Sequence, residues 1–489
     1  MHLPRINPKI SVSIVFVAAM FMSIMDSTIV NVALPSLSRQ FNVTGTAIDA
    51  VVVGYLVSLA VVIPASGWLG DRFGTKRVFL ISLALFSIAS ALCGLATSLP
   101  MLIGFRVLQG LAGGALTPVG TALLYRTFPP AERVQVSRIL NIPTALAPAM
   151  GPVLGGLLID KLSWNWVFYV NVPIGIVSCL FGLFFLTENS EHKTRDFDVL
   201  GFVLAGVGLA LTMYALSEGP NDGWTAPGIL ISGIVGVLIL IAFVIVELRV
   251  AHPMLDLRLF SNRAFRVCNL LSLFSGAGFM GLLYAAPIFL QEGRGATALT
   301  SGLTTFPEAL GVLVSTQIVG RLYPTLGPRR LILTGLSGVS IFMLLMCLMG
   351  QDTSLWFMRV LMFLIGAGMA CAFLPVQTAG FATITSAQTG QASALNNAQR
   401  QVGASLGVAL ISSIISIVGM TTLDAHGVAQ PNLNAYHAAF ITSAILIIIA
   451  TGISLLIRDS EAAATMRKSP LKEQPTSIDE AIAAAEASI

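Results

Sequence analysis

The sequence predicts an all-α polytopic membrane protein built from two six-helix bundles and two inserted helices. Three observations carry this prediction: the composition, a series of fourteen apolar runs, and an internal repeat. Of the 489 residues, 55% are hydrophobic and only 10% are charged, and the mean hydropathy is +0.85. Soluble proteins carry about 25% charged residues, so this composition excludes an ordinary soluble enzyme.

Each apolar run is long enough to cross a bilayer, because a transmembrane helix needs about 20 mainly apolar residues. The runs predict fourteen spans, near residues 11–34, 49–69, 78–97, 99–123, 139–159, 166–186, 199–216, 229–247, 267–290, 300–320, 331–349, 355–378, 402–420 and 437–457. The first run follows Arg5 and Lys9, as in a signal peptide. It is too long for one and contains Asp26, so we interpret it as a retained span.

The Lys and Arg residues predict the orientation. An even number of spans places both termini on one side, and with the termini inside, 22 of the 27 Lys and Arg residues fall in cytoplasmic segments, Arg400 among them. Cytoplasmic loops are enriched in these residues. We therefore expect a multi-pass protein of the cytoplasmic membrane with both termini in the cytoplasm. The net charge of +4 reflects this asymmetry, and we expect no nucleic-acid partner.

An internal repeat divides the chain into two halves. Residues 67–77 return in degraded form as 320–330, and Arg106-Val-Leu returns as Arg359-Val-Leu, both at an offset of 253. The glycines of the fifth span return at an offset of 252, as Gly151 and Gly155 followed by Gly403 and Gly407. The predicted organisation is a cytoplasmic N-terminus (1–10), an N-terminal six-helix bundle (11–190), an inserted helix pair (196–250), a C-terminal six-helix bundle (264–457) and a cytoplasmic tail (458–489). Parallel six-span repeats place a substrate path at their interface, so transport is the leading function class.

Four formal charges lie well inside predicted spans: Asp26, Arg106, Glu308 and Arg359. An ionisable residue there costs at least ~2.5–3.5 kcal/mol on insertion scales, which makes each a functional candidate. We expect Asp26 to carry a coupling proton, Arg106 to modulate it, and Glu308 to be a second acid or a cation-recognition site. The alternatives are a static ion pair between Asp26 and Arg106, and an Arg359 that only anchors the outer end of its span by snorkelling.

Five motifs carry a family resemblance. They are DSTIVNVALP (26–35), GWLGDRFGTKR (67–77), RVLQG (106–110), GPVLGG (151–156) and WNWVFYVNVP (164–173). With them the chain, over about residues 10–457, resembles the major facilitator superfamily. Within that superfamily it is similar to the fourteen-span drug:proton antiporter family of multidrug efflux pumps.

The resemblance implies a fold and further site residues. The fold is the major facilitator superfamily fold, with two additional helices between its halves. The loop motif implies an inner gate made by Gly67, Asp71, Arg72, Gly74, Lys76 and Arg77. The 151–156 motif implies an exporter rather than an importer, through Gly151, Pro152, Gly155 and Gly156. In the second half no acid stands where the first has Asp26 or Asp71, so we expect coupling to depend on the first half.

The predicted function is a proton-coupled antiporter that exports amphipathic small molecules by alternating access and confers antibiotic resistance. The alternative is a dedicated exporter of one metabolite, lipid or self-made antibiotic. A third alternative is a non-transporting membrane receptor or a membrane-embedded enzyme. The enzyme is disfavoured because the spans contain no HExxH pair and no Ser/His/Asp cluster.

The expected partners are protons, amphipathic and in some cases cationic substrates, the bilayer and, if the source has two membranes, a periplasmic adaptor. We expect a monomer without a cofactor. The five cysteines lie in apolar runs without CxxC spacing, so we expect neither disulfides nor a metal site.

Overall fold

The apolar runs fold into long helices, and the structure, a computed structural model, describes residues 7–43, 45–129, 132–188, 196–250, 253–423 and 429–466. The first half contains α1 (Pro8–Phe41), α2 (Gly45–Phe73), α3 (Thr75–Gly94), α4 (Leu99–Thr127), α5 (Arg133–Lys161), α6 (Trp166–Tyr169) and α7 (Asn171–Phe185). The inserted pair is α8 (Val199–Asp222) and α9 (Pro227–Arg249). Residues 1–6, the loop 189–195 and the tail 467–489 lie outside the described residues.

The second half repeats this series. Its helices are α10 (Arg263–Ile288), α11 (Ala298–Thr305), α12 (Pro307–Leu345), α13 (Leu355–Gly380), α14 (Thr389–Val418), α15 (Leu433–Ser454) and the short α16 (Ala463–Met466). Shorter elements join them: η2 (Leu257–Ser261), η3 (Phe289–Gly293), η4 (Met346–Leu348), η5 (Ser386–Gln388), η6 (Asp459–Ala462), and the antiparallel strands β1 (Thr421–Leu423) and β2 (Ala429–Pro431).

Polar residues cap these helices where the apolar runs begin. The Asn7 side chain accepts a hydrogen bond from the Lys9 N–H at 3.0 Å, just before Pro8 at the first position of α1. Asn262 and Ser354 cap α10 and α13 in the same way. A capping oxygen satisfies one of the backbone N–H groups that the first helical turn leaves unpaired. The starts of these helices are therefore set by local sequence.

Two glycines mark the same sharp turn in both halves. Gly74, between α2 and α3, has φ +94°, and Gly327, within α12, has φ +75°. Residues with a side chain rarely adopt such angles. At each turn a carboxylate from the end of that half accepts hydrogen bonds from backbone N–H groups: Glu188 from Lys76 and Arg77, and Asp459 from Arg329. The two turns are 253 residues apart, so the repeat seen in the sequence is also a repeat of backbone geometry.

The number of spans depends on how α12 and α5 are counted. Twelve helices among the described residues are long and apolar enough to cross a membrane, and α5 adds a thirteenth as a pair of segments bent by 42°. One of the twelve, residues 299–348, has 50 residues and would extend about 75 Å at 1.5 Å per residue, more than twice the thickness of a bilayer core. It breaks at Gly327 and covers two of the predicted spans. Counting its arms separately yields the fourteen that the sequence predicts, and the number stays a prediction.

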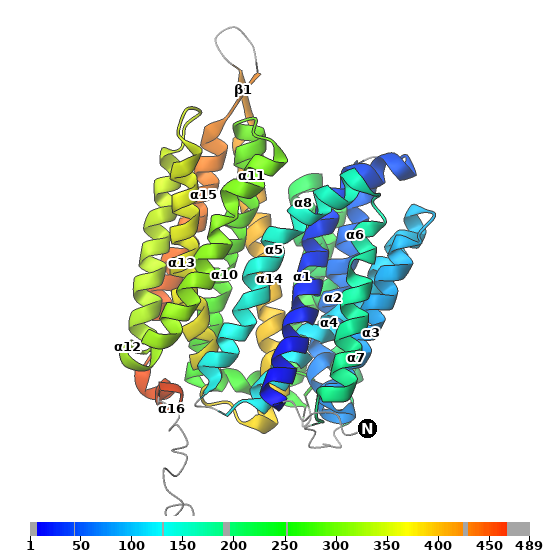
Figure 1. The fold of residues 1–489 in the computed structure, drawn as a ribbon, viewed down its shortest axis with the longest axis vertical. Coiled ribbons are helices and arrows are strands. Elements are labelled where there is room, and N and C mark those ends of the chain that lie inside the picture. The colour runs from blue at the N-terminus through cyan, green and yellow to red at the C-terminus, as the bar shows by residue number, and fades with distance from the viewer. Residues whose placement is uncertain are drawn as a thin grey trace, which may run out of the picture.

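The helices form two bundles that meet along α5 and α14 (Figure 1). α5 packs against α1 in its own half and against α12 and α13 in the other. α14 packs against α10 and α15, and it crosses to α2 and α4. The inserted α8 packs against α9, α2 and α14, which places the pair beside this junction. The second bundle has an apolar core of its own, whereas the core of the first bundle extends to second-half residues such as Phe381 and Leu395.

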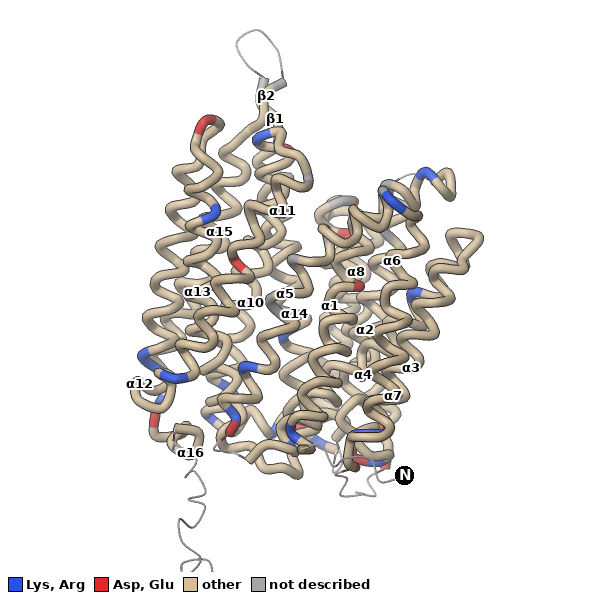
Figure 2. The backbone as a smooth tube through the Cα atoms, in the orientation of Figure 1, with Lys and Arg blue, Asp and Glu red and all other residues tan. Residues whose placement is uncertain are grey.

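The start of α1 and the short α16 lie at the same end of the molecule, opposite the β1–β2 hairpin (Figure 1). Lys and Arg residues gather at that end, and few charges lie between the two ends (Figure 2). We call it the loop end, because it carries the 67–77 turn. An even number of spans requires both ends of the helical region to lie on one side, as observed.

Candidate functional site

A fully buried ion pair lies within the first bundle. Arg106 of α4 donates from Nη1 to Asp26 Oδ2 of α1 at 2.6 Å, and neither side chain is more than 1% exposed. Two amides complete the environment of the carboxylate: Gln109 Nε2 and Asn171 Nδ2 donate to its Oδ1 at 3.0 and 2.8 Å. Asp26 thus accepts three hydrogen bonds, one of them from a cation, and these offset the large cost of burying its charge.

The Arg106 guanidinium has several further contacts. Its Nε donates to the Val51 carbonyl at 3.3 Å, and its Nη1 also donates to Gln109 Oε1 at 2.8 Å. The ring of Tyr55 stands 4.1 Å from the guanidinium carbon. A cation–π contact is strongest when it is shielded from water, as here. The cation therefore links α1, α2 and α4 around one charge pair.

Gln109 and Asn171 belong to the candidate site through their hydrogen bonds to Asp26, although the sequence did not single them out. Both lie in motifs that it quoted, in RVLQG and WNWVFYVNVP. Gln109 stands three residues after Arg106, which places both on one face of α4. That spacing was a usable signal for Gln109. Asn171 begins α7 and reaches Asp26 across 145 positions of sequence, which no local pattern encodes.

A cavity of about 120 Å³ lies between the two bundles, near this pair. α1, α2 and α4 line it from one side and α14 from the other, and its polar lining residues are Ser23, Ser27, Tyr55, Thr117, Asn397, Arg400 and Gln401. Tyr55 belongs to both features, since it lines the cavity and packs against Arg106. Tyr55 therefore connects the buried ion pair with the wall of the inter-bundle cavity.

The position of Arg400 corrects the sequence analysis, which counted it in a cytoplasmic loop. The expected span began at residue 402, whereas α14 begins at Thr389 and contains Arg400. Residues 388–401 are rich in Gln, Asn and Ser, so hydropathy alone does not recognise the first turns of this helix. At 1.5 Å per residue, Arg400 lies about 16 Å along the helix.

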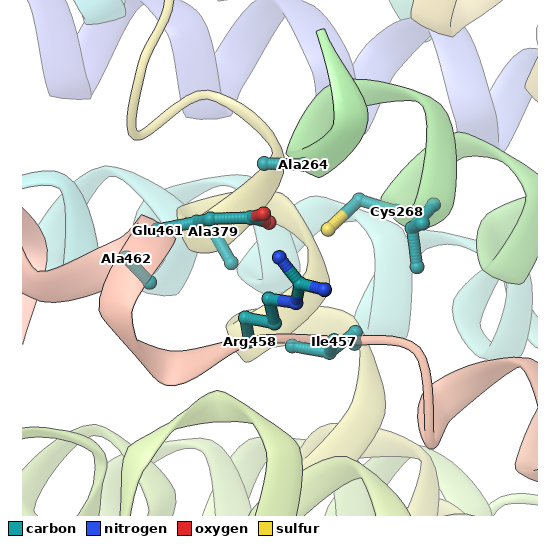
Figure 3. A pocket seen from close by; sticks show the side chains of 8 residues that line it. Ala264, Cys268, Ala379, Ile457, Arg458, Glu461 and Ala462 are labelled. Atoms are coloured by element: carbon teal, nitrogen blue, oxygen red, sulfur yellow. The ribbon is translucent and has the colours of Figure 1, made fainter.

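Two other hollows are poorer candidates for a substrate site. One, of about 10 Å³, lies at the loop end, where the side chains of Arg458, Glu461 and Cys268 converge (Figure 3). It has room for about one water molecule. A groove of about 780 Å³ runs along the outside of α2, α3 and α4, where aliphatic side chains such as Ile81 and Ile88 are more than half exposed. Such an apolar outer surface suits lipid chains.

Glu308 and Arg359, the two second-half charges, lie apart from the Asp26 network. Glu308 is 7% exposed in the first turn of α12, and its backbone packs closely against Gly366 of α13. The Arg359 guanidinium stands 4.8 Å from the ring centre of Trp356, which is 69% exposed. In the described residues the structure records no ion pair between Glu308 and Arg359. Arg359 thus has the surroundings of a residue that anchors a helix end.

Two residues of the loop motif contact the second half. Asp71 forms an ion pair with Arg126 of α4, and the pair lies against Gly390 in the first turn of α14. Gly67 meets the same turn so closely that a β-carbon there would lie 3.0 Å from the Gly390 carbonyl oxygen. A helix N-terminus carries a partial positive charge that favours a carboxylate. Asp71 therefore has two favourable partners, one in each half.

The other motif residues act within the first bundle. Lys76 Nζ donates to the Leu183 and Leu186 carbonyls at the C-terminal end of α7, where a cation is favoured. Gly74 leaves room for the Glu188 carboxylate, which accepts the hydrogen bonds from Lys76 and Arg77 described above. Arg72 lines the outer groove. These contacts fasten α3 to α7 rather than joining the bundles.

Further contacts between the halves gather at the loop end. Arg133 at the start of α5 donates to the carbonyls of Phe381 and Ile384, just after α13. The Phe381 ring stacks on Tyr125 of α4, with ring centres 4.4 Å apart. Ser137 and Thr378 share a buried hydrogen bond of 2.8 Å. The bundles are therefore joined at this end by polar and aromatic contacts.

The 151–156 glycines let α5 approach α1 beside Asp26. A β-carbon at Gly151 would collide with Thr28, and one at Gly155 would lie 2.9 Å from Ile29 Cγ1. Gly156 faces open space, and the side chain of Pro152 lies outside the described residues. The repeat-related glycines of α14, Gly403 and Gly407, meet Leu273 and Ala277 of α10 in the same way. Both halves thus use this motif for helix packing.

Comparison with known proteins assigns the family. The sequence matches the Major Facilitator Superfamily over residues 16–408, with a second match over residues 268–486. The chain belongs to the Major Facilitator Superfamily. As the superfamily consists of transporters, this member is a multi-pass membrane transporter and not an enzyme, as its sequence predicts.

Relatives of this superfamily member extend over most of its length. It is 32% identical to the uncharacterized MFS-type transporter YhcA of Bacillus subtilis, over 88% of this chain and 82% of that protein. It is 33% identical to the multidrug resistance protein B homolog of Mycobacterium tuberculosis, over 82% of this chain and 75% of that protein. The solved structure of the proton:xylose symporter XylE superposes with a TM-score of 0.63 at 15% identity, covering 94% of this chain and 100% of XylE, which shows the shared fold.

Proposed function

We propose that this transporter is a proton-coupled antiporter that exports amphipathic small molecules across the cytoplasmic membrane by alternating access. The observation that carries the proposal is the buried Asp26 carboxylate, whose partner Arg106 packs against Tyr55, a residue that also lines the inter-bundle cavity. An acid at such a site is retained at a considerable cost and is a functional candidate for that reason. Similarity to a multidrug resistance protein supports drugs as the exported molecules.

Proton uptake acts on the pair between Asp26 and Arg106. A protonated Asp26 no longer neutralises the guanidinium, so the contact that joins α1 to α4 weakens. Ser23 and Ser27 flank Asp26 on α1 and line the cavity, and Tyr55 packs on Arg106 and lines it too. A shift of α1 or of Arg106 therefore changes the cavity wall. In this way protonation and substrate binding influence each other.

The loop end acts as the inner gate. In the proposed orientation this end faces the cytoplasm, and the Asp71–Arg126 pair and the Arg133 contacts hold it closed. The conformation described here then corresponds to an outward-facing or occluded state. Opening towards the cytoplasm requires α14 and the segment after α13 to separate from α2, α4 and α5.

Replacing Asp71 by asparagine is expected to favour opening of the loop end. The change removes the charge that pairs with Arg126 and with the N-terminus of α14, and a lost charged contact of this kind shifts the equilibrium by about tenfold. The measurement is the rate at which an impermeant maleimide, added from the loop end, labels Ser27→Cys in a background without other cysteines.

The matched control is Glu132→Gln. It breaks the Lys9–Glu132 ion pair, which lies at the same end but within the first bundle. This control should label at the rate of the parent protein. Equal labelling of Asp71→Asn and the parent protein would contradict the gate.

Purified protein in liposomes tests the function directly. An imposed pH gradient, acidic on the side opposite the loop end, should drive uphill movement of a fluorescent drug towards that side, and dissipating the gradient should stop it. Transport that ignores the gradient would refute proton coupling. A panel of unrelated amphipathic compounds distinguishes a multidrug exporter from a dedicated exporter. A dedicated exporter would transport one of these compounds and not the others.

A further inference from the structure

Among the described residues, the structure records no carboxylate partner for Arg400, a cation embedded in α14. It is the twelfth of the 30 residues of α14, about 16 Å from the start of a helix about 45 Å long, so it lies well inside the helix rather than at its end. Within the described part of the chain, the structure records one acceptor for its guanidinium, Asn397 Oδ1 at 3.2 Å. A guanidinium carries five N–H donors, so several remain available. A charged side chain inside a transmembrane helix is a candidate for a functional residue.

Arg400 lies at the inter-bundle cavity. Its side chain is exposed and lines that cavity with Asn397 and Gln401 of the same helix. The residues that line the cavity include Arg400 and no aspartate or glutamate. The nearby acid, Asp26, is fully buried and already paired with Arg106. The cavity wall therefore carries a net positive charge.

We propose that Arg400 binds the anionic head group of the exported molecule, so that the preferred substrates are amphipathic organic anions such as carboxylates or sulfonates. This inference rests on the proposed export function and specifies its substrate class. Guanidinium groups bind carboxylates and related anions through two parallel hydrogen bonds. Serine, threonine and tyrosine hydroxyls also line the opposite wall, where Ser27 already donates to the Ile24 carbonyl.

The dimensions of the cavity fit a head group rather than a whole substrate. Sites for drug-sized molecules usually measure about 300–1,000 Å³, whereas this cavity has about 120 Å³. Its apolar wall is formed by Ile24, Leu56, Leu59 and Ile63 of α1 and α2. The charged head group of an amphipathic anion would lie beside Arg400. Its hydrocarbon portion would lie along these apolar side chains.

A pair of probes with one apolar body tests the assignment. Purified full-length protein in phosphatidylcholine nanodiscs is titrated with 4-(1-pyrenyl)butanoate, an anion, and with 4-(1-pyrenyl)butyltrimethylammonium, a cation. The parent protein should bind the anion more tightly. Arg400→Gln should weaken anion binding by about tenfold to a hundredfold and leave cation binding unchanged or stronger, and Arg400→Lys should retain part of the preference.

Arg321→Gln is the matched control, because Arg321 is an exposed arginine on α12, outside the cavity lining. It should leave both affinities unchanged. If Arg400→Gln weakens the binding of both probes equally, or does not weaken the binding of the anion, the proposal is overturned. Adding phosphatidylglycerol to the nanodiscs identifies the source of the anion. If this lipid competes with the anionic probe, the natural ligand is a lipid head group. If it does not compete, the natural ligand is a soluble anion.

Transport of the same probes separates this inference from the export function. If a pH gradient drives export of the cation but not the anion, the Arg400 assignment fails and proton-coupled export stands. If neither probe moves with the gradient although the anion binds through Arg400, the export function fails and the anion site stands.

Discussion

Asp26→Asn is expected to abolish proton-driven exchange in liposomes and reduce it to the level of protein-free vesicles. Asparagine is close to aspartate in size and preserves an oxygen that can accept from Gln109 and Asn171, but it cannot bind a proton in the pH range of transport. The measurement is gradient-driven substrate movement together with the accompanying pH change inside the vesicles.

The variant also leaves Arg106 buried without a counter-charge, so its folding has to be checked separately. Asp26→Asn/Arg106→Gln removes both charges and should fold better than Asp26→Asn while remaining uncoupled. Glu292→Gln is the control for loss of an acid, since Glu292 is exposed near the end opposite the loop end. Coupled exchange by Asp26→Asn at the parent rate would show that the ion pair is purely structural.

Arg106→Ala is expected to lower the free energy of unfolding by about 3–5 kcal/mol, which is the range for breaking one side of a buried ion pair. The Asp26 carboxylate would remain buried without its cation, and the contacts to Val51 and Tyr55 would be lost as well. Thermal or denaturant unfolding of the purified protein measures the change. Arg106→Lys keeps the charge and should destabilise the protein less, although it loses the planar contact with Tyr55.

The internal repeat provides the control for this experiment. Arg359 is the counterpart of Arg106 at an offset of 253, but it lies partly exposed beside Trp356. Arg359→Ala should therefore change stability by about 1 kcal/mol or less. A double-mutant cycle of Asp26→Asn and Arg106→Ala should show strong coupling between the two sites. Equal effects of the two arginine variants would contradict the special role of the first half.

Much of the candidate site could be predicted from sequence because burying charge in lipid is expensive. Asp26 and Arg106 stand out as the acid and the base inside first-half spans, and the structure places them in contact. Glu308 stands out in the same way, and its side chain is buried as well. The 151–156 motif stood out by its resemblance to an exporter motif, and two of its glycines lie where a β-carbon would meet α1.

Other parts of the site could not be predicted. Asp71 forms an ion pair with Arg126. Lys76 and Arg77 of the same motif instead form hydrogen bonds, Lys76 with the end of α7 and Arg77 with Glu188. These partners are separated by 55 to more than 100 positions, and the motif alone does not distinguish them. The polar first turns of α14 concealed Arg400, because a hydropathy average treats a helix that lines a cavity as if it were a loop.

The sequence by itself determined the class of the molecule, the positions of its apolar segments, its two-fold repeat and four embedded charges, but not Arg400. These are local properties, because every segment in a bilayer has to satisfy its own backbone and be apolar along its length. The tertiary structure alone decided that Gln109 and Asn171 complete the Asp26 site, that Tyr55 contacts Arg106 and also lines a cavity, and that Arg400 lines that cavity. Lipid and protein core are equally apolar, so a sequence gives little indication of which helix faces meet, and only packing brings these distant residues together.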